Sequence, residues 1–403
     1  MTEQPELHFH PVPGVRLAAG AAGIRYQDRN DLVLFELAAG STCAAVFTRN
    51  AFCAAPVTLA RTHLAAGAPH WWLINAGNAN AGTGARGLLD ATASCQALSE
   101  LTGDPLERVM PFSTGVIGEH LPVERIAAAL PALLGGLAAT HWPEAARAIM
   151  TTDRVPKLVS RQFEVGGRTA TLTGMAKGAG MICPNMATML GFLATDAAIE
   201  PGVLEACLHA AVERSFNAIT VDGDTSTNDA CVLAATGALG NAPIAAAGPD
   251  YAAFQSALDA VCVELATAIV RDAEGATKLV TVRIEGAASH AEARQVGYTI
   301  AHSPLVKTAL FASDPNWGRI LAAVGRAGLE DLAIARVRVW LGEVLIVDGG
   351  GRAATYTEGA GAAVMRAPEI LIRVALGRGE SSAEILTCDL SYDYVRINAE
   401  YRS

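Results

Sequence analysis

A lysine, a glycine-rich bend and a threonine lie close together near the middle of the chain, and together they could attack a carbonyl group. Residues 176–193 read A-K-G-A-G-M-I-C-P-N-M-A-T-M-L-G-F-L, with Lys177 before the glycines and Thr188 after a Pro184-Asn185 pair. Glycine permits backbone angles that are closed to other residues, and a Pro-Asn pair favours a turn. The spacing predicts that a tight loop delivers the hydroxyl of Thr188 to the start of an apolar, strand-like segment.

Two interpretations of Thr188 fit this pattern. Threonine is β-branched, and most threonines in apolar segments are ordinary strand residues. Alternatively, the hydroxyl of Thr188 attacks the carbonyl of Ala187 and breaks the chain by an N-to-O acyl shift. Thr188 would then be N-terminal, and its own α-amine, with a pKa of about 8, could serve as the base for its hydroxyl. Spacing alone favours the first interpretation.

The segment around Thr188 resembles the self-cleavage segment of the ornithine acetyltransferase family, the glutamate N-acetyltransferases of arginine biosynthesis. Members of that family are made as one chain and cut between Ala and Thr, here Ala187 and Thr188. The resemblance covers nearly the whole chain. The other matching strings are N-A-G-N-A-N-A-G-T-G (75–84), S-T-G-V-I-G-E (113–119), M-T-T-D (150–153), D-G-D-T-S-T-N-D (222–229), R-D-A-E-G-A-T-K (271–278), S-D-P-N-W-G-R (313–319) and Y-D-Y-V-R-I-N-A-E-Y-R-S (392–403).

The resemblance implies a set of site residues around the nucleophile Thr188. The hydroxyl of Thr114 and the backbone N–H of Gly115 would form an oxyanion hole, and one pre-aimed donor of this kind is worth about 3 kcal/mol of barrier. The substrate contacts would be Thr151, Lys177, Thr188, Glu274, Asn398 and Ser403.

The residue types suit an N-acetylated amino acid. A lysine ammonium can hold the α-carboxylate, and we hypothesise that Glu274 pairs with the distal amine of ornithine. From residue type alone, Lys177 and Glu274 also fit solvated charges, and Thr151 and Asn398 fit helix caps. Relatives often carry Thr-Thr-Asp-Thr where this chain has Thr-Thr-Asp-Arg at 151–154, so the choice between Thr151 and Thr152 stays open.

The reaction implied by the resemblance is a ping-pong acetyl transfer. Thr188 takes the acetyl group from N2-acetylornithine, ornithine leaves, and glutamate then accepts the acetyl group to give N-acetylglutamate. No metal or bound cofactor is implied. Some relatives also acetylate glutamate from acetyl-CoA, and the sequence leaves open whether this chain uses that co-substrate.

Three other functions remain compatible with the residues. A related self-processing aminopeptidase or amidase would share the threonine nucleophile but hydrolyse its acyl-enzyme. A nucleotide-dependent oxidoreductase is suggested by the G-x-G-x-x-G string at 82–87, although the region before it looks antiparallel and no acidic residue closes a second strand about 20 positions later. A non-catalytic binding protein would keep an intact chain. The resemblance favours the acetyltransferase over all three.

Composition and sequence patterns argue against nucleic-acid binding, secretion and membrane insertion. A net charge of −10 over 403 residues argues against a nucleic-acid surface, which needs clustered Lys and Arg. The acidic N-terminus shows no pattern of a secretory signal, so we expect none. The apolar stretch 126–140 is interrupted by Pro131 and two glycines, and it is too short to cross a bilayer. We therefore expect a cytoplasmic enzyme.

The eight cysteines form no Cys-x-x-Cys pair, which predicts free thiols rather than a zinc site.

The apolar periodicities predict a mixed α/β (α+β) fold with a smaller α/β unit at the C-terminus. The acidic, hydroxyl-rich loop at 222–229 lacks the frame of a Ca²⁺ loop and is predicted to be a buried polar turn near the site. Strands are expected at 32–37, 43–48, 71–74, 107–114, 163–165, 169–172, 188–194, 278–284, 334–341, 343–347, 369–376 and 384–390. Helices are expected at 88–101, 123–137, 201–215, 250–273, 303–311 and 318–327.

The resemblance adds an expectation about layers and chains. It implies a sandwich of mixed and antiparallel sheets flanked by helices. Cleavage would give two intertwined chains, 1–187 and 188–403, and these would assemble as an α2β2 heterotetramer. Within the second chain we place the rest of the sandwich at 188–290 and the C-terminal subdomain at 291–403. The final block, 392–403, would fold back into the site.

Overall fold

Two β-sheets pack face to face in the N-terminal two thirds of the chain. The computed structural model describes residues 7–183 and 189–401. The first sheet has the order β1 (Val15–Gly20), β2 (Leu32–Leu37), β4 (Trp71–Asn78) and β5 (Val109–Val116). The second has the order β3 (Thr42–Phe47), β9 (Ala230–Ala235), β8 (Leu190–Thr195), β7 (Arg168–Lys177) and β6 (Lys157–Val165). Only β4–β5 and β8–β9 are parallel pairs within these two sheets.

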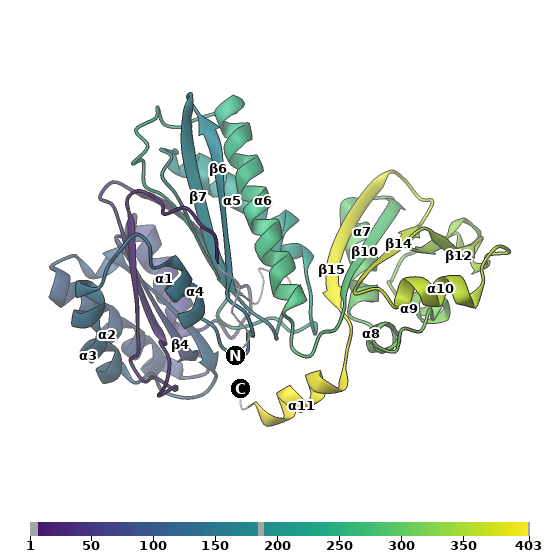
Figure 1. Ribbon diagram of the computed structural model, residues 1–403, viewed down its shortest axis with the longest axis horizontal. Helices are drawn as coiled ribbons and strands as arrows, with labels where there is room; N and C mark the ends of the chain where they lie inside the picture. The colour runs from purple at the N-terminus through teal and green to yellow at the C-terminus, as the bar shows by residue number, and fades with distance from the viewer. Residues whose placement is uncertain (1–6, 184–188, 402–403) are drawn as a thin grey trace.

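Helices cover the outer faces, so the layers run helix, sheet, sheet, helix (Figure 1). The first sheet is covered by α1 (Ala55–Ala66), α2 (Gly84–Thr102) and α3 (Val123–Gly135), and the second by α5 (Pro201–Arg214) and α6 (Pro249–Arg271). The short helix α4 (Trp142–Ala148) contributes Trp142 to the core between the sheets. This is the flanked sandwich that the resemblance implies.

Alternating side chains along each strand build these layers. In β2, Phe35 faces the core between the sheets while Leu34 faces the helices, as the two-residue period of a strand requires. The ring of Phe35 lies 5.3 Å from that of Trp72 in the same sheet and 6.0 Å from that of Phe192 in the facing sheet, measured between centroids. The aromatic cluster therefore joins the two sheets.

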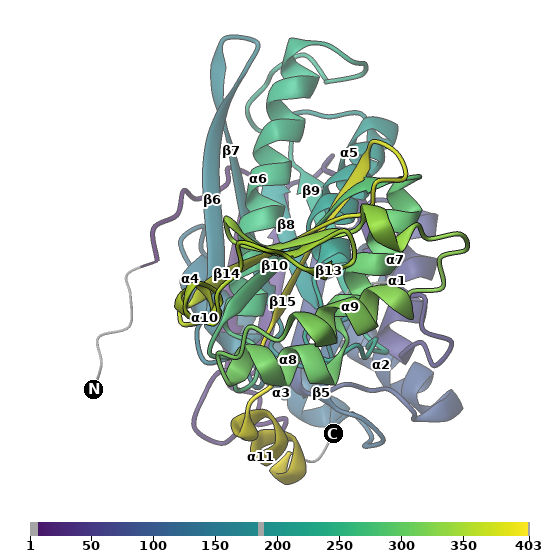
Figure 2. The same cartoon turned by 90° about the vertical axis from the view of Figure 1, so that its right-hand side faces the viewer.

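A second unit follows α6 and contains a six-stranded sheet with its own core (Figure 2). The strand order is β13 (Gly351–Arg352), β12 (Val344–Asp348), β11 (Arg338–Leu341), β14 (Glu369–Ala375), β10 (Leu279–Ala287) and β15 (Ser381–Cys388). Its helices are α7 (His290–Ala301), α8 (Pro304–Phe311), α9 (Trp317–Gly325) and α10 (Glu358–Met365).

This unit starts earlier than the predicted residue 291. The strand β10, which the sequence assigns to the sandwich, pairs in parallel with β14 and antiparallel with β15. Those partners lie far along the chain, so a local pattern could not reveal them. The strand predicted at 334–341 is also too long, because residues Ile334–Arg336 form a 3-10 turn before β11.

The region of the G-x-G-x-x-G string differs from the prediction in one respect. The strands β4 and β5 are parallel and α2 connects them, so the string does open the helix of a β-α-β unit. Its last glycine has a packing reason. A Cβ on Gly87 would overlap the Thr83 hydroxyl, which donates to Asn80, and Asn80 in turn donates to the carbonyl of Gly87 at 2.8 Å. The packing of the turn is therefore enough to require this glycine.

The last helix, α11 (Tyr392–Glu400), leaves the C-terminal unit and runs back beneath the sandwich (Figure 1). Ser391 caps it by accepting from the N–H of Tyr394, and the Ser391 hydroxyl donates to the carbonyl of Gly275 at 2.6 Å. A Cβ on Gly275 would lie 2.5 Å from the nitrogen of Tyr394. The glycine therefore allows α11 to pass close to the segment after α6.

The helix α6 is long and apolar enough, by length and composition alone, to cross a membrane. It packs instead on the second sheet, where Phe254, Leu258, Val261 and Leu265 are buried in the core. The apolar residues of α6 therefore pack in the core of the sandwich.

Candidate functional site

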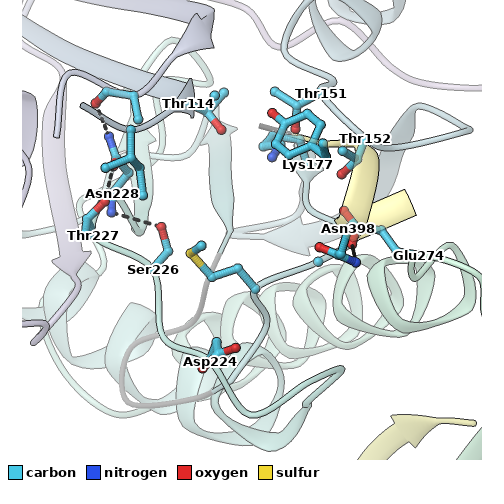
Figure 3. A pocket seen from close by; sticks show the side chains of 16 residues that line it. Thr114, Thr151, Thr152, Lys177, Asp224, Ser226, Thr227, Asn228, Glu274 and Asn398 are labelled. Carbon is cyan, nitrogen blue, oxygen red and sulfur yellow. Dashed lines mark hydrogen bonds between the residues drawn. The ribbon is translucent and has the colours of Figure 1, made fainter. Parts of the chain in front are cut away.

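A cavity of about 280 Å³ lies where the two sheets, the 222–229 loop and α11 meet. Its wall is built from segments that are far apart in the sequence. The lining residues are Ala79, Thr114, Gly115, Ile117, Thr151, Thr152, Lys177, Gly180, Met181, Asp224, Ser226, Thr227, Asn228, Glu274, Asn398 and Tyr401. Figure 3 shows Ser226, Thr227 and Asn228 on one side and Lys177, Thr151, Thr152, Glu274 and Asn398 on the other, with Thr114 between the two groups.

Thr114 and Gly115 lie at the carboxyl end of β5, where the pairing with β4 becomes irregular. Gly115 has a φ of +133°, and a Cβ there would lie 2.5 Å from the nitrogen of Asn78 and overlap Gly77. Only glycine fits this close approach of two backbones. The strand thus ends with a buried threonine followed by a glycine, and both line the cavity.

The 222–229 loop closes the same side of the cavity. Asn228 donates from Nδ2 to the carbonyls of Ala79 at 2.6 Å and Ser113 at 2.9 Å, which ties the loop to the ends of β4 and β5. Asp222 accepts the backbone N–H groups of Met181 and Ile182 at 2.7 and 3.0 Å. The polar turn lies at the site, as predicted, but it is buried only at Asn228 and Asp229, and Asp224 is exposed. The sequence did not single out Asp224, Ser226, Thr227 or Asn228 as cavity residues.

The opposite side of the cavity carries charge. Asn398 of α11 donates from Nδ2 to Oε2 of Glu274 at 2.8 Å. A Cβ on Gly180 would overlap the Glu274 carboxyl, so the glycine bend makes room for this side chain. Lys177, at the end of β7, is 9% exposed and lines the same wall. An ammonium and a carboxylate therefore face one small cavity.

Burial lowers the pKa of Lys177, and Asp153, Glu274 and Asp229 oppose that effect, while Lys157 adds to it. For Asp153, burial alone would raise the pKa of the carboxyl. The positive charges of Lys177 and Lys157, together with the N–H of Gly178, outweigh burial and hold that pKa well below its usual range. Asp153 is therefore an ionised carboxylate beside Lys177.

Asp229 is the opposite case. Burial raises the pKa of this carboxyl well above its usual range, and the N–H of Met189 and the charge of Lys177 oppose the rise only in part. Its Oδ2 has no hydrogen-bond partner among residues 7–183 and 189–401. Asp229, directly before β9, therefore binds its proton more tightly than an exposed carboxyl does.

The structure brings six of the predicted site residues to this one cavity, and these are Thr114, Gly115, Thr151, Lys177, Glu274 and Asn398. Thr152 also lines it, so the choice between Thr151 and Thr152 stays open. The predicted cleavage pair, Ala187 and Thr188, and the terminal Ser403 lie outside the described residues.

Comparisons with known proteins show which family this chain is similar to. A profile described as ArgJ family matches residues 16–403. The arginine biosynthesis bifunctional protein ArgJ of Methylococcus capsulatus is 62% identical over 399 residues, 99% of this chain and 97% of that protein. Its counterpart in Pseudomonas fluorescens is 56% identical over 396 residues, 98% of each chain.

Among solved structures, an ornithine acetyltransferase of Mycobacterium tuberculosis, complexed with ornithine, is 34% identical, with a TM-score of 0.38. The match covers 43% of this chain and 93% of that chain. The family profile and the 62% identical relative both extend over almost the whole sequence, and they confirm the resemblance found in the residues. The chain belongs to the ArgJ family.

Proposed function

We propose that this protein is a glutamate N-acetyltransferase of the cyclic route of arginine biosynthesis, with N2-acetylornithine as donor and glutamate as acceptor. One observation carries the proposal. A single cavity is lined by Thr114 and Gly115, which offer a hydroxyl and a peptide N–H, and by Lys177 and Glu274, which offer an ammonium and a carboxylate. That pattern matches an acetyl carbonyl at one end of a substrate and an α-carboxylate with a distal amine at the other.

In the proposed mechanism, cleavage between Ala187 and Thr188 gives Thr188 a free α-amine. The Thr188 hydroxyl attacks the acetyl carbonyl of N2-acetylornithine, and the α-amine takes the hydroxyl proton. Thr114 and Gly115 donate hydrogen bonds to the tetrahedral oxyanion. The C–N bond then breaks, the proton passes to the leaving nitrogen, and ornithine departs from an acetyl-Thr188 ester.

The second half-reaction reverses these roles. The amine of glutamate attacks the ester carbonyl, the same donors hold the second oxyanion, and the Thr188 oxygen leaves and regains its proton. In both halves Lys177 holds the α-carboxylate. Glu274, held by Asn398, pairs with the distal ammonium of ornithine. Charge-assisted bonds of this kind gain strength in a buried site. Thr151 and Ser403 complete the proposed substrate contacts.

The proposal also covers the oligomeric state, a second acetyl donor and the cellular location. We propose that fragments 1–187 and 188–403 stay together and form an α2β2 heterotetramer in the cytoplasm. Relatives of this chain are named bifunctional proteins. That name supports acetyl-CoA as a second acetyl donor.

The test is a product assay with purified protein and N2-acetylornithine, with and without glutamate, read by mass spectrometry. The proposal predicts ornithine and N-acetylglutamate in equal amounts only when glutamate is present. Free acetate formed without glutamate would indicate a hydrolase and contradict it. A parallel assay with acetyl-CoA and glutamate tests the second donor.

A further inference from the structure

Three buried charged side chains form a connected group directly behind Lys177, and we name Asp153, Lys157 and Asp272 the Lys157 cluster. The Nζ of Lys157 lies 2.7 Å from Oδ1 of Asp153 and 2.8 Å from Oδ2 of Asp272. The three side chains are 1%, 0% and 5% exposed for Lys157, Asp153 and Asp272. The cluster contacts the cavity wall at Lys177, whose Nζ is 3.9 Å from Oδ2 of Asp153.

Asp153 uses both carboxylate oxygens to fix the cavity wall. Its Oδ1 accepts the N–H of Gly178 at 2.7 Å, which holds the glycine bend that follows Lys177. Its Oδ2 accepts the N–H of Thr151 at 3.1 Å. One carboxylate therefore sets the position of Thr151, of the bend and of the Lys177 ammonium together.

Asp272 fixes the other side of the cluster. It caps the C-terminal end of α6, and its Oδ2 accepts the N–H groups of Arg154 at 3.0 Å and Val155 at 3.3 Å. Glu274 follows two residues later. Lys157 thus joins the loop that carries Thr151 to the turn that carries Glu274.

The charges around Lys177 single out Asp153. Among residues 7–183 and 189–401, the charged or titratable groups that act on Lys177 are Asp153, Lys157, Glu274 and Asp229. Glu274 accepts from Asn398 and faces the cavity, where a substrate ammonium would compete for it. Burial raises the pKa of Asp229 well above its usual range, which makes it a weaker charged partner than Asp153, and Lys157 repels a second ammonium. Asp153 is the ionised partner that stays with Lys177 whether or not substrate is bound.

We propose that Asp153 is a positioning residue of the acetyl-donor site, which keeps the Lys177 ammonium charged and aimed into the cavity while Lys157 and Asp272 hold Asp153 in place. The inference rests on the proposed function, because it assigns to Lys177 the task of binding a substrate carboxylate. Removing one partner of a buried ion pair leaves the charge of the other partner uncompensated. Loss of Asp153 should therefore act through Lys177.

The first test is Asp153→Asn, which keeps the shape and removes the charge. The KM for N2-acetylornithine should rise about 10-fold or more while kcat changes less, since Lys177 binds ground state and transition state alike. The basic limb of the pH profile of kcat/KM should move to lower pH.

The matched control is Asp196→Asn, because Asp196 is a buried carboxylate that accepts the N–H of Thr171 at 2.7 Å near the other end of β7. The control should behave as wild type.

A second measurement does not need catalysis. Competitive labelling with trace acetic anhydride, read by mass spectrometry across a pH series, reports the pH at which the Lys177 amine becomes reactive. In Asp153→Asn that pH should fall, and in Asp272→Asn, the variant to use if the first does not fold, it should fall by less. An unchanged labelling profile in both variants would overturn the inference. If wild type gives no acetyl transfer but these shifts appear, the proposed function fails while the pairing stands.

A double-mutant cycle separates positioning from folding. If Asp153 acts through Lys177, Asp153→Asn should raise KM in the wild type but add almost nothing in a Lys177→Met background. Equal effects of Asp153→Asn in both backgrounds would mean a purely structural role and would overturn the inference.

Discussion

Asn398 in the last helix donates a hydrogen bond of 2.8 Å to Glu274, a residue 124 positions earlier in the chain. This bond makes α11 part of the cavity wall rather than a loose tail. The glycines at 180 and 275 leave room for Glu274 and for α11 respectively. The carboxylate at the charged end of the cavity is thus held by elements from three separate regions of the sequence.

Glu274→Gln should raise the KM for N2-acetylornithine but not the KM for glutamate. The amide still accepts from Asn398, but it no longer carries a charge for the distal ammonium of N2-acetylornithine. A lost charge-assisted hydrogen bond costs about 1.5–3 kcal/mol, so the KM for this donor should rise about 10-fold to 100-fold. The KM for glutamate should stay the same or fall, because its distal group is a carboxylate. Steady-state kinetics with each substrate varied measure both values.

The control for this variant is Glu264→Gln. Glu264 pairs with Arg161 on the surface, where its side chain is 49% exposed, and its replacement should leave both KM values unchanged. An equal rise of both KM values in Glu274→Gln would argue against recognition of the distal amine.

Gly115→Ala should abolish most of the acetyl transfer. The new Cβ would meet the backbone of Gly77 and Asn78, so the N–H of residue 115 must move away from the oxyanion position. Loss of one such donor lowers kcat by about 100-fold to 1,000-fold. Gly166→Ala is the matched control, because Gly166 also has a positive φ, +57°, but open space around it in the β6–β7 hairpin. Wild-type kcat in Gly115→Ala would contradict the oxyanion role.

Asp229→Asn should make the protein less sensitive to rising pH. The folded-state pKa of this carboxyl is raised by burial, so between the ordinary and the raised pKa the folded state binds more protons than the unfolded state. Stability from this group is therefore present at low pH and lost as the pH rises. Urea unfolding at about pH 5 and about pH 8 should show the variant gaining stability relative to wild type at the higher pH. A variant that loses stability there would mean that Asp229 is ionised.

Local sequence patterns predicted much of the fold and less of the site. The Gly166-Gly167 pair between apolar strands predicted the β6–β7 hairpin, and Ser303 and Pro304 begin α8 close to the predicted start. These features depend on neighbours in sequence. The placement of β10 in the C-terminal sheet was missed because its partners, β14 and β15, lie some 90 or more residues later.

The site residues show the same division. Residue patterns alone gave Thr114, Gly115 and Lys177 only ambiguous roles, and the family resemblance was needed to bring them together. Asp153 lies within a matching string. Its proposed positioning role, however, depends on Lys157, four residues later, and on Asp272, which is 115 residues from Lys157. A buried charge network of this kind appears only when the chain is folded.

The central claim is that the chain cuts itself before Thr188, and the intact mass of the denatured protein tests it most directly. Wild type should give two fragments, residues 1–187 and 188–403, whereas Thr188→Ala should give one chain of 403 residues. Thr58→Ala, a change of an exposed threonine on α1, should cut as wild type does. A single uncut wild-type chain would contradict the account, because Thr188 would never gain the free amine that the proposed mechanism requires.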